Sequence, residues 1–549
     1  MPLQDSMTRL EGSDRGTYGY PVNSGKLTCI NSIQIDAPTI KLVACIRISR
    51  MENSSILDVT RLLEPACYPH ETRDIHLIST HISWVILTGE FAYKIKRPVS
   101  FGFLDYSSLE QRHHFCRMEV SLNQKLGSDL YLEVVPITQS HNGLSVNGKG
   151  QIVEYAVKMC QFDERDNFTF LAKQNLLKEK HIDNLATTLA RLHSHADRAI
   201  DQSDIAGREL TSIWITDTLK QLKELSPGHQ SLMETVAQTE TLLANHTDLI
   251  ESRYHNGLIR DCHGDLHLGN IIWRNQRTQL FDRIEFNEEL RWVDVMNDLA
   301  FPFMDLLHTG HHDLAWRLIN RYLDETGDYE GIQLLPLFTS YRSLVRIKIM
   351  LLDQSSNDVD HNIQSHLRIL EPLFGNSSTK LYITHGLSGS GKTTVARQLA
   401  QNEHLIIIRS DVLRNSGIDQ GDYEKNTAFQ YTAENRDAVY ERMLALASRL
   451  LDEKISLILD ATFLKHSQRN KFRKLATAAK AIFKIIVCQA DRKLLEQRIR
   501  NRRIEGDASE ANVDTLTSQI QELEGLSTSE QSLIFADTNT HSQERRLGD

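Results

Sequence analysis

The chemistry in this sequence begins with a glycine-rich loop near its C-terminal end. The segment Gly386-Leu-Ser-Gly-Ser-Gly-Lys-Thr393 has the spacing G-x-x-x-x-G-K-T. Glycines let backbone N–H groups curl around a phosphate, the lysine neutralises the outer phosphates and the threonine hydroxyl ligates Mg²⁺. We therefore expect a site for ATP or GTP with Mg²⁺. The residues expected to hold the nucleotide are Gly386, Leu387, Ser388, Gly389, Ser390, Gly391, Lys392, Thr393 and Thr394, of which Thr393 is also a metal ligand.

The elements around this loop have the order that phosphate binding requires. A buried-strand pattern covers Lys380–His385 and a helix pattern follows the loop. Two later strand patterns, 405–408 and 455–459, each end close to an aspartate. Because ligands of open parallel sheets bind at the carboxyl ends of strands, Asp411 is predicted to be the base for a substrate hydroxyl and Asp460 to hold Mg²⁺ or its water. Each aspartate could instead cap the helix that follows it.

A basic helix pattern lies further along the same part of the chain. Arg498 and Arg502 fall one turn apart on a single face of the segment 492–503. Arginines so placed close over the transferring phosphoryl group in phosphoryl transfer. We therefore predict that both arginines contribute to catalysis as a lid, and the alternative is a solvated basic face.

With Gly506–Ala511 after the arginines, this layout resembles small P-loop kinases of AAA type, in the group of gluconate kinase, polynucleotide 5′-kinase and zeta toxin. The resemblance covers about 378–549 and implies a parallel sheet with helices on both faces. It also implies transfer of the γ-phosphoryl group of ATP to a small acceptor.

A second set of chemical residues lies upstream, in the segment His263-Gly-Asp265-Leu-His-Leu-Gly-Asn270. The spacing D-x-x-x-x-N lets an aspartate meet a substrate hydroxyl while the asparagine turns back to hold Mg²⁺ on the nucleotide. Asp265 is therefore predicted to be a catalytic base and Asn270 a metal ligand. A hairpin pattern follows and returns Asp282 beside Asn270 as a second metal ligand, with Glu285 as the alternative for this role.

A lysine and a glutamate complete this second set. Lys94 shares a strand face with Ala92, the relation found in the kinase V-A-I-K strand, and Lys96 shares that face too, so the choice between the two lysines stays open. Glu119 lies within the apolar stripe of a helix pattern over 107–126. A buried carboxylate needs a cation, and Lys94 is the expected partner at the nucleotide. The alternative is that Glu119 lies at the edge of the stripe and reaches water.

Over about 60–370 this set resembles the aminoglycoside phosphotransferase-like branch of the kinase fold, where the loop reads H-G-D. The resemblance implies that Asp294 and Asp298 brace the catalytic loop and that Val153–Met159 is the interlobe hinge facing adenine. Two features depart from the branch. No G-x-G-x-x-G loop precedes Lys94, and Phe281–Phe286 lacks the usual pattern after the metal-binding aspartate.

The length of 549 residues exceeds what one hydrophobic core usually supports, so we expect more than one domain. Residues 1–50 show no sustained period and are predicted to be a poorly ordered extension, with Met51 as an alternative native start. A kinase-like domain is expected over 51–375 and a P-loop domain over 376–549, because the polar segment Gly375–Thr379 breaks the pattern. The predicted fold class is α/β and α+β, with a bilobal protein-kinase-like fold before a P-loop NTPase.

The composition argues against several classes of protein. No apolar run approaches the ~18–20 residues that span a bilayer, and the start lacks the layout of a signal peptide. The seven cysteines are scattered, which is typical of reduced thiols, so we expect a cytoplasmic protein without a disulfide framework. The net charge is −10, and the C-terminal part has nearly equal numbers of basic and acidic residues. Nucleic acid is therefore an unlikely partner.

The order of the two sets resembles a bacterial fusion family of predicted kinases, over about 51–549. We predict an ATP- and Mg²⁺-dependent phosphotransferase with two kinase-type sites, each acting on a small-molecule hydroxyl. One alternative is a nucleotide-gated regulator with a degenerate N-terminal kinase domain. Another is a polynucleotide 5′-kinase-like repair factor. The sequence names neither acceptor, because 200–260 and 415–445 carry no motif.

Overall fold

The structure, a computed structural model, describes residues 57–101, 104–202, 207–352, 359–374, 378–415, 433–505 and 512–538. Contacts divide the chain into residues 1–38 and 39–549, so all described residues belong to the second unit. The predicted extension over 1–50, the alternative start Met51 and the segment Gly506–Ala511 lie outside the described residues. Most of the Gly375–Thr379 segment lies outside them too, and the predicted domain bounds stay a prediction.

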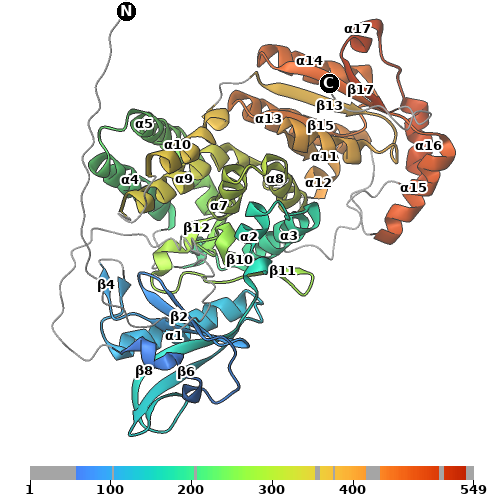
Figure 1. The fold of residues 1–549 in the computed structure, drawn as a ribbon. Helices are drawn as coiled ribbons and strands as arrows, with labels where there is room; N and C mark the ends of the chain where they lie inside the picture. The colour runs from blue at the N-terminus through green and yellow to red at the C-terminus, as the bar shows by residue number, and fades with distance from the viewer. Residues whose placement is uncertain are drawn as a thin grey trace, which may run out of the picture. The chain divides into compact units, whose positions relative to one another are not determined.

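The first part of the described chain is an antiparallel six-stranded sheet with one long helix packed on it (Figure 1). Helix α1 (Leu109–Lys125) packs against the two longest strands, and Ser108 caps it by accepting a hydrogen bond from the Gln111 N–H. The predicted helix over 107–126 is therefore present. In sheet order the strands are β1 (His76–Ser79), β2 (Ser83–Leu87), β3 (Phe91–Lys96), β8 (Gln151–Cys160), β6 (Tyr131–Ser140) and β7 (Gly143–Val146).

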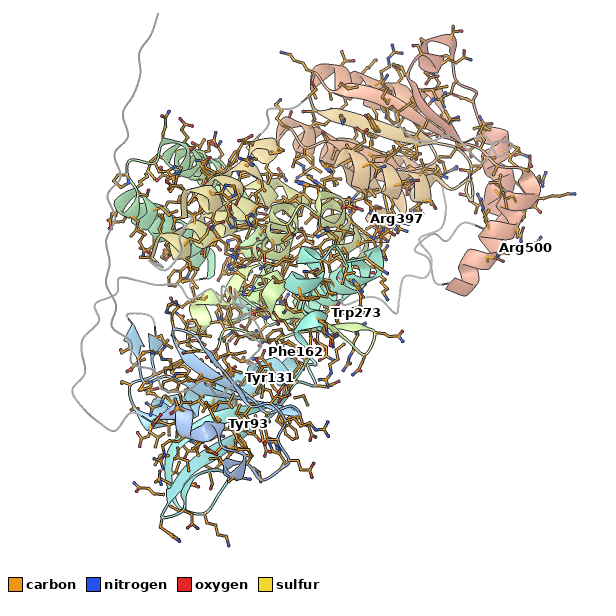
Figure 2. All side chains as sticks on the ribbon, viewed as in Figure 1. Tyr93, Tyr131, Phe162, Trp273, Arg397 and Arg500 are labelled. Atoms are coloured by element: carbon orange, nitrogen blue, oxygen red, sulfur yellow. The ribbon has the colours of Figure 1, made fainter. Side chains whose placement is uncertain are left out.

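A mainly helical lobe follows. Phe162, labelled in Figure 2, lies where the chain passes from the sheet into this lobe, and its ring packs on Phe281 with centroids 5.2 Å apart. Every residue from Val295 to Leu307 of α7 is buried, which makes that helix the centre of the lobe. The helices are α2 (Phe168–Lys173), α3 (Glu179–His195), α4 (Gly207–Leu225), α5 (Gln230–Asn245), α6 (Thr247–His255), α7 (Val295–His308), α8 (His312–Thr326), α9 (Leu335–Leu352) and α10 (Val359–Arg368).

Two small strand pairs lie inside the helical lobe and position its loops. Strand β9 (Ile259–Asp261) pairs with β12 (Trp292–Asp294) directly before the segment that begins at His263. Strands β10 (Ile271–Arg274) and β11 (Arg277–Leu280) form the hairpin that the sequence predicts. The catalytic-loop motif therefore begins after one strand and ends at the start of another.

The last part of the chain is a parallel five-stranded sheet in the order β14-β15-β13-β16-β17. Apolar residues alternate along its strands: Tyr382 faces α11, whereas Leu381 and Ile383 belong to the core shared with α13 and α14. Helices therefore cover both faces, as the predicted fold class requires. The strands are β13 (Lys380–His385), β14 (Ile406–Arg409), β15 (Leu457–Asp460), β16 (Ile482–Cys488) and β17 (Ile534–Thr538), and the helices are α11 (Lys392–Glu403), α12 (Ser410–Asn415), α13 (Ala433–Asp452), α14 (His466–Ala478), α15 (Arg492–Glu505), α16 (Val513–Glu522) and α17 (Thr528–Gln531).

Helix α8 of the helical lobe contacts the edge of this parallel sheet. Asn320 donates to the Leu405 carbonyl oxygen at 2.9 Å and accepts from the Ile407 N–H at 2.8 Å. The Tyr329 hydroxyl accepts from the Arg409 N–H at 3.2 Å. These contacts give hydrogen-bond partners to backbone N–H and C=O groups that an edge strand otherwise leaves unpaired. In the described part of the chain, no helix is long and apolar enough to cross a membrane.

Asn320→Ala tests this covered edge. The substitution leaves the buried Leu405 carbonyl and Ile407 N–H without their partner, which costs about 1–3 kcal/mol. We expect the urea midpoint of unfolding to fall accordingly. Asn245→Ala, at an exposed residue that ends α5, is the control, with an expected change within about 0.5 kcal/mol. Equal stability of the two variants would contradict the described contact.

Candidate active sites

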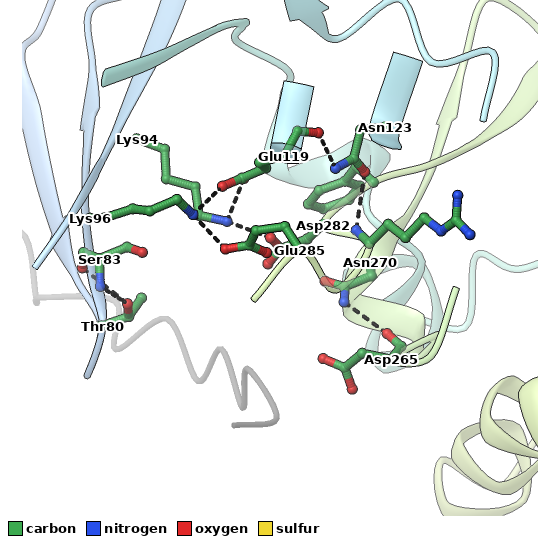
Figure 3. Close-up of polar contacts among 12 residues, drawn as sticks. Thr80, Ser83, Lys94, Lys96, Glu119, Asn123, Asp265, Asn270, Asp282 and Glu285 are labelled. Carbon is green, nitrogen blue, oxygen red and sulfur yellow. Dashed lines mark hydrogen bonds and ion pairs between the residues drawn. The ribbon is translucent and has the colours of Figure 1, made fainter. Parts of the chain in front are cut away.

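The lysines of strand β3 and the glutamate of α1 form one buried network (Figure 3). Lys94 Nζ lies 2.7 Å from Glu119 Oε1, and Lys96 Nζ lies 2.7 Å from Glu119 Oε2. Glu119 has no exposed surface, so the alternative of a stripe-edge glutamate that reaches water is wrong. Both lysines meet the glutamate, for which the sequence predicts Lys94 as the partner.

The second contact of each lysine distinguishes them. Lys94 also binds the Asp282 carboxylate, whereas Lys96 binds Glu285 and lies 3.3 Å from the Tyr106 hydroxyl. The Lys94 side chain is 14% exposed and that of Lys96 only 1%. Burial alone would lower the pKa of each lysine, but the carboxylates outweigh it and raise both. Lys94 is thus the lysine beside the expected metal ligand.

The H-G-D segment folds as a tight loop around its own backbone. Asn270 donates from Nδ2 to the Asp265 carbonyl oxygen at 2.9 Å, which closes the D-x-x-x-x-N turn. His263 Nε2 lies 2.9 Å from the Phe281 carbonyl oxygen, and the Phe281 N–H donates to the Asn270 carbonyl at 3.1 Å. The hairpin therefore returns Asp282 to the loop, as the sequence predicts. Asp282 takes a left-handed backbone, φ 61°, at this return.

Asp298 braces this loop. Its carboxylate accepts from the His263 N–H at 3.2 Å and the Gly264 N–H at 2.9 Å, and His193 Nε2 lies 3.2 Å away. Burial would raise the pKa of Asp298, but the His193 contact and the charges of His263 and Arg342 together outweigh it and lower this pKa to about 2. The brace expected of Asp298 is therefore present.

Asp294 does not contact the loop in the same way. It caps α7 by accepting from the Met296 N–H at 2.8 Å and pairs with Arg253 Nε at 2.7 Å. The expectation that Asp294 also braces the loop is therefore wrong, because its carboxylate is taken up by a helix cap and a buried guanidinium.

The predicted base, Asp265, is nearly enclosed. It is 4% exposed, and His267 Nε2 lies 3.8 Å from its Oδ2. Burial raises the pKa of Asp265 to about 8, because the nearby guanidinium groups of Arg346 and Arg342 only partly oppose the loss of water. A pKa near neutrality suits a group that accepts a proton from a hydroxyl.

The glycine-rich loop at 386–393 has the geometry of a phosphate cradle. Lys392 Nζ donates to the Leu387 carbonyl oxygen at 2.8 Å, and α11 begins directly after Gly391, whose φ is 92°. A Cβ at Gly386 would lie 2.2 Å from the Cys488 carbonyl oxygen, so only glycine fits there. Thr393 Oγ1 donates to Asp460 Oδ2 at 2.7 Å. A hydroxyl and a carboxylate at this distance match the oxygen ligands that Mg²⁺ prefers.

One pocket collects the other residues predicted for this site. Asp411 lines it together with Lys392, Thr393 and Asp460, and Arg414 holds the Asp411 carboxylate at 3.0 Å. Burial raises the pKa of Asp460 against the opposing charges of Arg409 and Lys392. Sequence reasoning missed further lining residues, which no local pattern marks, among them Arg414, Arg436, Tyr440 and Gln519.

The predicted arginine lid is described only in part. Arg498 donates from Nη1 to the Gly389 carbonyl oxygen at 3.1 Å, so it contacts the glycine-rich loop. Arg502 belongs to α15, but its side chain lies outside the described residues. The role of both arginines therefore stays a prediction.

Arg409 joins this site to helix α8. Its Nη1 lies 3.1 Å from Asp324 Oδ1, and its Nε lies 3.7 Å from Asp460 Oδ2. Asp324 also accepts from Arg397 at 2.8 Å. A carboxylate of the kinase-like part thus shares an arginine with the expected Mg²⁺ ligand of the P-loop part.

Known proteins are similar to this chain over different shares of its length. A family model described as an AAA domain matches residues 381–526. An uncharacterized protein of Mycobacterium tuberculosis is 28% identical over 447 residues, which cover 79% of this chain and 88% of that protein. A solved choline/ethanolamine kinase family protein from Mesorhizobium loti is 13% identical, with a TM-score of 0.36, over 57% of this chain and 93% of its own. A solved aminoglycoside phosphotransferase with streptomycin and ATP is 16% identical, with a TM-score of 0.34, over 58% of this chain and 97% of its own.

Residues 381–526 form a P-loop domain of the AAA type. The predicted order of a kinase-like fold followed by a P-loop kinase domain is confirmed. The antiparallel six-stranded sheet comes first in the chain, and the parallel sheet that the family model matches comes last. Together they support a nucleotide-dependent phosphotransferase.

The charge of Asp265 predicts a pH dependence of stability. An unfolded aspartate has a pKa of about 3.9, so the folded chain, with a pKa of about 8, binds more protons across this window. The free energy of unfolding is therefore expected to fall as pH rises from about 4 to 8. Asp265→Asn should remove this contribution, which the difference in urea midpoint between variant and wild type at pH 5 and pH 8 measures. Asp313→Asn, at an exposed residue of α8, is the control, and a difference that is constant with pH would contradict the burial of Asp265.

Because Arg409 contacts both Asp324 and Asp460, we expect Asp324 to affect Mg²⁺ binding at the P-loop site. In Asp324→Asn, Arg409 loses one of its carboxylate partners and should pair more closely with Asp460, in competition with the metal. The Mg²⁺ concentration for half-maximal nucleotide binding is expected to rise about fivefold, since ~1 kcal/mol is the lower limit for two charges at 4 Å. Titration with a fluorescent ATP analogue in a Lys94→Ala background measures it. Asp313→Asn, at an exposed residue of the same helix, is the control and is expected to have no effect. If the Mg²⁺ titration curves of Asp324→Asn and Asp313→Asn coincide, the link between Asp324 and the metal site is wrong.

Proposed function

We propose that this chain is an ATP-dependent phosphotransferase with two kinase-type sites, each of which transfers the γ-phosphoryl group to a hydroxyl of a small molecule. The observation that carries the proposal is the unbroken contact network from Glu119 through Lys94 to Asp282. A degenerate kinase-like domain has no need to keep a lysine, its glutamate and a metal-binding aspartate in contact. The second site rests on the cradle at 386–393.

In the kinase-like site the residues act mainly by position and charge. Asp265 accepts the proton of the acceptor hydroxyl while the new O–P bond forms and the bond from the γ-phosphorus to the bridging oxygen of ATP breaks, which releases ADP. Asn270 and Asp282 would hold Mg²⁺, and Lys94 would neutralise the phosphates. Mg²⁺ supplies charge neutralisation on the phosphate oxygens.

In the P-loop site a corresponding set of side chains lines one pocket. Lys392 would neutralise the outer phosphates, Thr393 and Asp460 would hold Mg²⁺, and Asp411 would accept the hydroxyl proton. Asp411 lines the same pocket as these three residues, which supports its role as the base.

A second candidate function is a regulator in which nucleotide at one site controls the other. The contacts of Arg409 with both Asp324 and Asp460 favour it, because they join the two parts of the chain at an expected metal ligand. The missing glycine-rich loop before Lys94 also favours this reading.

Single-site variants of the full chain test the proposal. A metabolite pool is incubated with γ-labelled ATP and wild type, Asp265→Asn or Lys392→Ala. We expect each variant to lose a different labelled product, with a fall of at least about a thousandfold, because each removes a group central to transfer. The controls are Asp201→Asn and Lys474→Ala, both at exposed positions. If Asp265→Asn leaves every labelled product unchanged, the kinase-like site is not catalytic and the regulator is the better account.

A further inference from the structure

A pocket lies beside Asp265, and neither lysine of strand β3 lines it. Its wall is built from helices α4, α7 and α9, the catalytic loop, and strand β12 with residues of the segment before it. Because Asp265 is part of this wall, a molecule held here presents its hydroxyl to the proposed base. The inference below rests on the proposed function of this site and concerns the chemistry of its acceptor.

Polar atoms without a partner gather in this wall. Six buried side-chain atoms of the lining residues have no hydrogen-bond partner among the residues that the structure describes. An unsatisfied buried polar atom costs about 1–3 kcal/mol, and folded proteins keep few of them. Such a group beside a catalytic carboxylate indicates a polar ligand. The atoms are Thr211 Oγ1, Trp214 Nε1, Asp265 Oδ1, Trp292 Nε1, Asn297 Oδ1 and Arg342 Nη2.

Three of these atoms can only donate. The indole N–H groups of Trp214 and Trp292 and the Nη2 group of Arg342 have no acceptor capacity. Their ligand must therefore offer acceptor oxygens. Asn297 Oδ1 accepts only, and the Asp265 carboxylate accepts when it is ionised, so both suit the hydroxyl groups of the same ligand.

Arg342 gives this wall a buried positive charge. The residue is 4% exposed, and it contacts backbone carbonyls and rings: Nη1 donates to the Gly264 carbonyl at 3.1 Å, and the guanidinium lies 4.9 Å from the Phe301 ring centre. Among the described residues, no carboxylate lies within ion-pair distance of Arg342. Asp265 is the single carboxylate among the lining residues. A ligand cation would therefore meet a guanidinium and find no acidic residue apart from the base.

We propose that the acceptor of the kinase-like site is a small hydroxylated carboxylate, whose carboxylate group is bound by Arg342 together with the indole N–H groups of Trp214 and Trp292. One guanidinium matches one negative charge, whereas a phosphate ester would bring a second negative charge beside Asp265 and the nucleotide. The apolar side chains of Ile284 and Leu290 line the same pocket and suit the carbon skeleton of the acceptor.

Binding of matched ligand series tests the proposal. In a Lys392→Ala background with a non-hydrolysable ATP analogue and Mg²⁺, calorimetry compares glycerate, glycerol, 3-aminopropane-1,2-diol and glycerol 3-phosphate, and then glucuronate, glucose, glucosamine and glucose 6-phosphate. We expect the acid of at least one series to bind at least about tenfold more tightly than each of its three counterparts. A preference for the amine, the neutral alcohol or the phosphate ester, or no acid that binds better than its alcohol, overturns the proposal.

Two variants connect the preference to this wall. Arg342→Gln is expected to weaken binding of the acid at least about tenfold and to change binding of the neutral alcohol less than about twofold. Trp214→Phe keeps a ring and removes one donor, so it gives the same test with less risk to folding, with an expected loss of about threefold to tenfold. Arg368→Gln, at an exposed residue of α10, is the control. If Arg342→Gln and Trp214→Phe both leave the acid's affinity unchanged, the assignment is wrong.

Turnover separates this inference from the proposed function. The acid that binds is expected to be phosphorylated by the Lys392→Ala chain and not by a chain that also carries Asp265→Asn. If the acid binds through Arg342 and no transfer occurs, the proposed function of the site fails while the ligand class stands. If transfer that depends on Asp265 occurs to an amine instead, the function stands and the ligand class fails.

Discussion

Glu119 has no exposed surface, and two lysine ammonium groups hold its charge inside the protein. A buried carboxylate without such partners costs several kcal/mol, so this contact fixes α1 against strand β3. Lys94 then reaches Asp282, and Lys96 reaches Glu285. Both acidic residues follow the hairpin that starts at the catalytic loop. The sheet, its helix and the loop of the helical lobe are therefore positioned by one set of paired charges.

Helix α8 contacts elements that belong to both candidate sites. Tyr322 on this helix lies 2.8 Å from His193 Nδ1, and His193 contacts the Asp298 brace of the loop that carries Asp265. Two residues further along, Asp324 binds Arg409, which also lies near Asp460. A small shift of α8 would therefore change polar contacts next to the bases and metal ligands of both sites. Such a continuous contact path permits coupling between the two sites.

Most of the predictions that the structure confirms depend on residues that lie close together in the sequence. The turn from Asp265 to Asn270, the return to Asp282 and the cradle at 386–393 depend on neighbours along the chain, and all three have the expected geometry. The contacts that the sequence missed join distant segments, as in the Arg409 pair with Asp324 and the wall around Arg342. No local pattern marks such residues, because their partners are chosen by tertiary packing. The role of Asp294 was wrongly predicted for the same reason, since its partner Arg253 lies on helix α6, 41 residues earlier in the chain.

The central claim is that both parts of the chain bind nucleotide, and the binding stoichiometry tests it most directly. Equilibrium dialysis of the full chain against a non-hydrolysable ATP analogue with Mg²⁺ gives the number of nucleotides bound per chain. The account predicts two for the wild type and one for either Lys94→Ala or Lys392→Ala. One nucleotide per wild-type chain, with none left in Lys392→Ala, would contradict it.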